Sequence, residues 1–104
     1  MDSYIVVTTL CDNKDIANII IDTLLEKKLI AGSQMSKVSS KYWWKNTIEE
    51  NIEYKLEFRT KESKYPLIER EIKKIHNYDV AEISYYELKN GSKEFLNWID
   101  ENML

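Results

Sequence analysis

The sequence predicts one α+β domain in which an antiparallel sheet carries helices on a single face. Stretches with the two-residue alternation of strands occupy residues 4–10, 34–44, 48–59 and 81–88. Segments with three- and four-residue apolar spacing fall between them, at residues 16–25 and 65–75, and a third follows residue 92. The order β-α-β-β-α-β plus a terminal helix matches the ferredoxin-like plan. A length of 104 residues suits a single domain spanning residues 1–104.

The first strand and helix are predicted from β-branched residues and from a capping pattern. Residues 4–10 are rich in Val and Thr, and Asp12 with Asp15 has the spacing of a capping box. Gly32 stands just past the expected end of the helix. The apolar face of this helix is expected to consist of Ile16, Ile19, Ile20, Leu24 and Leu25.

A long hairpin is predicted in the middle of the chain. Residues 34–44 and 48–59 both alternate, and Lys45-Asn46 separates them. Asn46 tolerates positive φ, so a two-residue primed turn is expected there. The hairpin also carries Tyr42, Trp43, Trp44 and Tyr54, more aromatic surface than a monomer leaves in water, which predicts self-association.

The second half repeats the helix-to-strand pattern. Ser63 is expected to cap a helix that has Pro66 in its first turn and ends near His76. Residues 81–88 form the last predicted strand, and a turn at residues 90–92 leads into a short helix containing Trp98.

Composition excludes several classes of function. A net charge of −3 gives no long-range attraction to nucleic acid or to an anionic membrane, and no apolar run approaches the roughly 20 residues that span a bilayer. Two glycines are too few for a P-loop or a dinucleotide fingerprint, and no zinc-ligand spacing occurs. The single Cys11 and the absence of a signal-peptide pattern favour a soluble protein in the reducing cytoplasm.

Residues 76–83, His-Asn-Tyr-Asp-Val-Ala-Glu-Ile, are the richest functional segment because they lie on a helix-to-strand connection. Glu82 is expected to orient the imidazole of His76. Cys11 and His76 have three interpretations: packed structural residues, a nucleophile and base of a hydrolase, or ligands of a soft ion such as Cu(I). Five carboxylates have three interpretations: ligands of a divalent ion, an acid and base pair, or solvated surface groups. They are Glu49, Glu50, Glu53, Asp79 and Glu82.

Several motifs together resemble the CutA family of divalent-cation-tolerance proteins over nearly the whole chain. They are Glu-Lys-Lys-Leu-Ile-Ala at 26–31, Tyr42 with Trp44, Ile48-Glu49-Glu50 with Glu53, Arg59-Thr60, residues 76–83 and Trp98. The resemblance implies a single CutA-like domain in a homotrimer similar to the PII signalling proteins. It also implies a cytoplasmic, non-catalytic role in binding or signalling, linked to copper or another divalent cation, with an unidentified protein partner.

Carried over by motif, the ligand-binding residues line clefts between subunits, where Arg59 supplies the cationic contact to a small anion if that is the ligand. His76 also belongs to the residues carried over by motif, and His76 and Cys11 are the candidate metal ligands, Cys11 from the chemistry of its thiol alone. Ile30-Ala31-Gly32 replaces the family's usual Ala-Ala-Cys, which removes one thiol, and Asn77 replaces a proline. A purely structural trimeric scaffold is the alternative function. The implied ligand-binding residues are Tyr42, Trp44, Glu53, Arg59, Thr60, Tyr78, Asp79 and Glu82.

Overall fold

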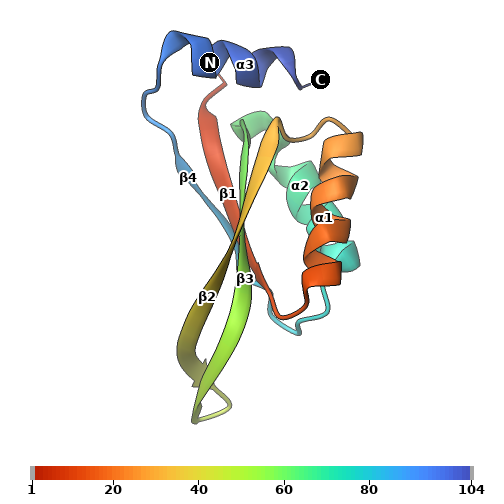
Figure 1. Cartoon of the computed structure of the whole chain (residues 1–104), viewed down its shortest axis with the longest axis vertical. Helices are drawn as coiled ribbons and strands as arrows, with labels where there is room; N and C mark the ends of the chain where they lie inside the picture. Colours follow the sequence, from red (N-terminus) through yellow and green to blue (C-terminus); the bar gives the residue numbers. More distant parts are fainter. Residues whose placement is uncertain (1, 104) are drawn as a thin grey trace.

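The computed structural model describes residues 2–103 and contains one four-stranded antiparallel sheet in the order β2-β3-β1-β4. The strands are β1 (Tyr4–Cys11), β2 (Gly32–Trp44), β3 (Thr47–Lys61) and β4 (Ile83–Glu87). Helices α1 (Lys14–Glu26) and α2 (Tyr65–Ile75) lie side by side on one face of the sheet, and a short 3-10 turn, Glu62–Lys64, precedes α2 (Figure 1). Helix α3 (Lys93–Glu101) crosses the end of the sheet (Figure 1). The predicted ferredoxin-like fold is confirmed.

The core lies between the sheet and the first two helices. Strand side chains alternate between the two faces, so Leu56 and Phe58 of β3 point toward the helices with Ile5 and Val7 of β1. The predicted face of α1 is only partly right, because Ile20 and Leu24 are buried whereas Ile19 is 52% exposed and Leu25 is also exposed. The helix contribution to the core consists of Ala17, Ile20, Leu24, Ile68 and Ile72.

The β2–β3 hairpin extends well beyond the helices and gives the molecule its longest dimension, 45 Å (Figure 1). Its turn is confirmed as predicted, since Lys45 and Asn46 have φ values of 48° and 65°. Trp44 pairs with Thr47 next to the turn, and the register continues without interruption to Gly32 opposite Arg59.

Two predicted helix caps are wrong. Asn13, not Asp12, caps α1, because its Oδ1 accepts the backbone N–H groups of Asp15 at 2.7 Å and Ile16 at 3.1 Å. Ser63 lies in the 3-10 turn and its hydroxyl donates to Asp2 at 2.6 Å instead of capping α2. Pro66 does occupy the first turn of α2, as predicted.

Gly32 also has a different role from the one predicted. The chain leaves α1 through Lys28, whose φ is 55°, and Gly32 begins β2. A Cβ atom on Gly32 would lie 2.9 Å from Cη2 of Trp98. Glycine is therefore required for the close approach of α3 and not for ending α1.

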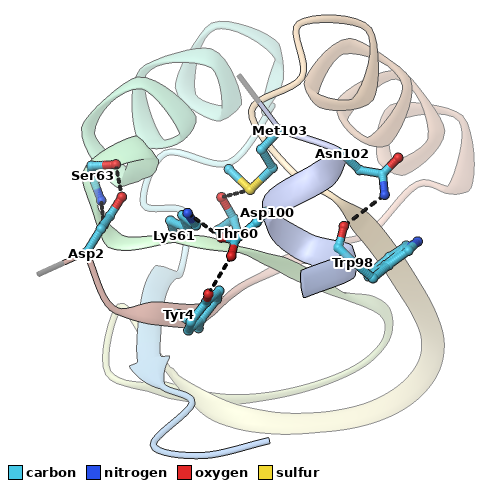
Figure 2. A network of polar contacts seen from close by, with 9 residues as sticks. All are labelled: Asp2, Tyr4, Thr60, Lys61, Ser63, Trp98, Asp100, Asn102 and Met103. Carbon is cyan, nitrogen blue, oxygen red and sulfur yellow. Dashed lines mark hydrogen bonds and ion pairs between the residues drawn. The ribbon is translucent and has the colours of Figure 1, made fainter. Parts of the chain in front are cut away.

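Helix α3 is attached to the sheet by polar contacts at the end opposite the hairpin tip (Figure 2). Asp100 accepts a hydrogen bond from the Tyr4 hydroxyl at 2.8 Å and forms an ion pair with Lys61. Thr60 donates to the carbonyl of Leu29 at 2.7 Å and lies 3.7 Å from Sδ of Met103. No helix within the described part of the chain has the length and apolar character needed to cross a bilayer.

Candidate functional site

A cleft of about 780 Å³ opens where the connection after α2 faces the half of the hairpin nearer its turn. Tyr42, its pair Glu49, and Glu53 lie on the face of the sheet away from the helices, because side chains alternate along β3 and Leu56 and Phe58 point into the core. The volume of the cleft falls within the roughly 300–1,000 Å³ of small-molecule sites. The side chains and backbone that line it belong to Leu10, Ser40, Lys41, Tyr42, Trp43, Trp44, Glu49, Glu53, Asn77, Tyr78, Asp79, Val80 and Glu82.

The structure therefore brings together six of the eight predicted ligand-binding residues. These are Tyr42, Trp44, Glu53, Tyr78, Asp79 and Glu82. Glu49 was expected only as one of five carboxylates that could bind a divalent ion, and Ser40 was not expected at the site, although strand alternation places each on the same face as Tyr42. The position of Leu10 could not be found this way, because it depends on the pairing of β1 with β3.

Glu53 is the most buried polar group of the cleft, with 3% of its surface exposed. The hydroxyl of Tyr78 donates to its Oε2 at 2.6 Å. Burial and this bond to Glu53 together raise the pKa of Tyr78 far above its ordinary value, so the phenol remains a donor. Within residues 2–103 no side chain or backbone group donates to Oε1.

The charge of the cleft is strongly negative. Four carboxylates, those of Glu49, Glu53, Asp79 and Glu82, line it with a single ammonium, that of Lys41. Tyr42 is held in place by Asn51, whose Nδ2 donates to the phenolic oxygen at 2.7 Å. Electrostatics here favour a cationic ligand over the small anion that was considered from the sequence.

Arg59 and Thr60 do not belong to this cleft. Arg59 follows Glu53 by six residues on the same strand, which corresponds to about 20 Å. Its guanidinium lines a separate hollow of about 160 Å³ with Gly32 and Trp98, and Thr60 is buried beneath α3. Within one chain Arg59 is therefore separated from residues 76–83. Because the expected cleft lies between subunits, a contact from Arg59 of a neighbouring subunit stays a prediction.

His76 lies behind Tyr78, with ring centroids 4.6 Å apart. Its Nε2 is 2.6 Å from the carbonyl oxygen of Leu10, which can only accept, so this nitrogen carries the proton. Its Nδ1 accepts the backbone N–H of Tyr78 at 3.2 Å. The imidazole is thus oriented by backbone groups of Leu10 and Tyr78, and the expected role of Glu82 is wrong.

Cys11 is fully buried beside this imidazole, with Sγ 3.8 Å from Nε2 of His76. Burial, with smaller contributions from Asp12 and Glu53, raises the pKa of the Cys11 thiol to about 11. An activated nucleophile needs a low pKa and a base with a free lone pair. Neither condition holds here, so the geometry disfavours the hydrolase interpretation.

The raised pKa of Cys11 predicts a specific loss of stability in alkali. The pKa is 9.0 for an ordinary thiol and about 11 in the fold, so between these pH values only the unfolded chain releases the proton. The free energy of unfolding should therefore fall with rising pH by up to about 1.4 kcal/mol per pH unit from this group. Urea unfolding at pH 8 to 11 should show a shallower fall for Cys11→Ala. Parallel curves for the two proteins would contradict the prediction.

Carboxylates in the cleft are spread around its wall and do not converge on one point. Among residues 2–103, no three His, Cys, Asp or Glu side chains are grouped closely enough to hold one metal ion. A metal bound by this chain would need further ligands from water or from another molecule.

Comparison with known proteins gives consistent results. A family model described as CutA1 divalent ion tolerance protein matches residues 5–102. The divalent-cation tolerance protein CutA of Archaeoglobus fulgidus is 36% identical over 80 residues, which are 77% of this chain and 78% of that protein. The corresponding protein of Thermococcus kodakarensis is 33% identical over 99 residues, 95% of this chain and 94% of that protein.

Solved structures agree with the sequence matches. The structure of the periplasmic divalent cation tolerance protein CutA from Archaeoglobus fulgidus superposes with a TM-score of 0.92 at 31% identity, covering 95% of this chain and 97% of that one. The similarity thus extends over the sheet, the helices and the residues of the cleft.

Proposed function

This chain belongs to the CutA1 divalent ion tolerance protein family, and from that premise we propose that it is a non-catalytic homotrimer that binds a divalent cation, copper in the first place. The acidic cleft is the proposed site, and a protein partner recognises the metal-bound form. The observation that carries this proposal is the set of four carboxylates facing one ammonium across the cleft.

Carboxylate oxygens suit hard divalent cations, which take six or more oxygen ligands including water. Glu53 is the central ligand in this proposal, because it is buried and its Oε1 has no donor among the described residues. Glu49, Asp79 and Glu82 line the same cleft, but no three of these side chains are grouped closely enough to hold one ion within the described residues. A neighbouring copy that faces the cleft would supply the ligands that one chain lacks.

Cys11 and His76 form a second candidate position, for Cu(I). Their Sγ and Nε2 atoms are 3.8 Å apart, close to the span of a thiolate and an imidazole bound about 2.3 and 2.0 Å from a shared ion. Binding requires the thiol to lose its proton and Nε2 to release the carbonyl of Leu10. Copper affinity at this pair should therefore increase with pH.

Assembly is proposed from the apolar surface of the hairpin. Trp43 and Ile48 are cross-strand neighbours and are 71% and 55% exposed, and Ile52 is exposed beside them. Large apolar patches of this kind mark interaction surfaces. A second copy of the chain is proposed to pack against this surface.

The cytoplasm is the proposed compartment because Cys11 has no disulfide partner in the chain. Cell fractionation tests it, since the similar Archaeoglobus protein is described as periplasmic.

Native mass spectrometry with and without copper tests assembly and ion binding together. A trimer that takes up copper in a fixed ratio is expected, and Glu53→Gln should abolish uptake if the cleft is the site. Cys11→Ala should abolish it instead if Cu(I) occupies the buried pair. Glu57→Gln is the matched control, because Glu57 lies on the same strand face outside the cleft. A trimer that excludes copper would overturn the copper assignment.

A further inference from the structure

Aromatic side chains from two separate segments of the chain line the acidic cleft. Tyr42 and Trp44 come from one side of β2, and Tyr78 comes from the connection after α2. Ring faces carry a negative potential that attracts cations, most strongly for Trp. Trp44 already has such a neighbour, since Nζ of Lys45 lies 5.7 Å from its centroid. The same surroundings would attract the cationic group of a ligand.

Glu53 provides a buried carboxylate whose second oxygen a ligand can contact. Only 3% of its surface is exposed, and the Tyr78 hydroxyl donates a hydrogen bond to only one of its two carboxylate oxygens. A buried carboxylate with an unused acceptor is costly unless a donor or a cation reaches it. A cationic group in the cleft is expected to approach Oε1, since Glu53 is one of the residues that line it.

The shape of the site distinguishes between kinds of cation. A volume of about 780 Å³ is far larger than a bare metal ion fills. The described carboxylates do not converge as metal ligands do, while the rings offer surface that a hydrated metal ion does not use. A cation with several carbon atoms matches the volume, the charge and the rings together.

We propose that the cleft binds organic ammonium ions, with the alkylated nitrogen against Tyr42 and Trp44 and its charge compensated by Glu53. This inference rests on the proposed function in taking the cleft as the ligand site. It differs from that function in the chemical class of the ligand. The ligand class follows from the combination of rings and an incompletely satisfied carboxylate, not from the acidic residues alone.

Choline and its uncharged isostere 3,3-dimethyl-1-butanol are the test pair, because they differ only in having nitrogen or carbon at the branched centre. Isothermal titration of each into the full chain, freed of metal with EDTA, should give at least about tenfold tighter binding of choline. Equal affinity for the two compounds, or no choline binding, would overturn the proposal.

Three variants locate the binding. Trp44→Leu and Glu53→Gln should each weaken choline binding about tenfold. Glu57→Gln should leave it within twofold: Tyr86 donates to Glu57 at 2.8 Å much as Tyr78 does to Glu53, but this pair is outside the cleft. Equal losses in Glu53→Gln and Glu57→Gln would overturn the assignment. The Trp44→Leu result stands on its own if Glu53→Gln does not fold.

Copper uptake, measured separately on the same protein, keeps the two proposals distinct. Copper binding without choline binding overturns the ammonium proposal and leaves the proposed function intact. Choline binding without copper uptake supports the ammonium proposal and overturns the metal assignment. Loss of both ligands overturns the cleft as a binding site.

Discussion

Replacing Trp43 and Ile48 together with serine is expected to convert the assembled protein into a monomer. The two side chains are 71% and 55% exposed and face each other across the hairpin. Burying one large apolar side chain contributes about 1.5–3 kcal/mol, so losing both at each contact should weaken association at least a hundredfold. Sedimentation velocity over a range of protein concentrations measures this directly.

Ile19→Ser is the matched control for that experiment. Ile19 is similarly exposed, at 52%, but lies on α1 and not on the hairpin. Its substitution should leave the sedimentation coefficient unchanged. A double variant that still sediments as the parent does would place the assembly surface elsewhere, and a parent that is monomeric at every concentration would remove the homotrimer from the proposal.

Tyr78→Phe is expected to lower the free energy of unfolding by about 2–3 kcal/mol at neutral pH, the range for hydrogen bonds to buried charged groups. The substitution removes the only hydrogen-bond donor to the Glu53 carboxylate among the residues that the structure describes. Only 3% of the surface of Glu53 is exposed. The ring itself is kept, so its contact with His76 at 4.6 Å remains. Urea unfolding followed by circular dichroism gives the value.

Tyr86→Phe provides the comparison for this measurement. Its hydroxyl makes the same kind of bond to Glu57, at 2.8 Å, but Tyr86 is exposed, so the loss should stay below about 1 kcal/mol. Similar small losses in both variants would mean that water replaces the Tyr78 hydroxyl. Glu53 would then be less isolated than its burial indicates.

The fold was predictable because its signals are local. Alternation in β2 and β3, with Asn46 in the turn, defines the hairpin, and Pro66 marks the start of α2. The N-terminus of α1 was misplaced by one residue because Asp12 and Asn13 both make good caps, and only the backbone direction after β1 decides between them. The role of Gly32 depends on α3, 61 or more residues later in the chain, which no local pattern contains.

The site was predictable only where its residues are close together in sequence or share a strand face. Tyr78, Asp79 and Glu82 follow α2 in one segment, and Tyr42 and Trp44 alternate on one strand. The motif groups Arg59 with them, although Arg59 lies near the C-terminal end of β3, six residues beyond Glu53, and lines a separate hollow. His76 contacts the backbone carbonyl of Leu10 in β1. Every residue has such a carbonyl, so the identity of residue 10 does not predict this contact.

The central position of β1 has a consequence for the order in which the chain folds. The β2–β3 hairpin can form as soon as residues 32–61 exist, since its pairs grow outward from Trp44 and Thr47, and hairpins form in about 1–10 μs. Strand β1 must wait, because Tyr4 pairs with Lys61 and Ile5 pairs with Glu87. During synthesis on the ribosome, β1 and α1 therefore emerge first but complete their sheet only after β4 has been made, and closing these long loops should set the overall folding rate.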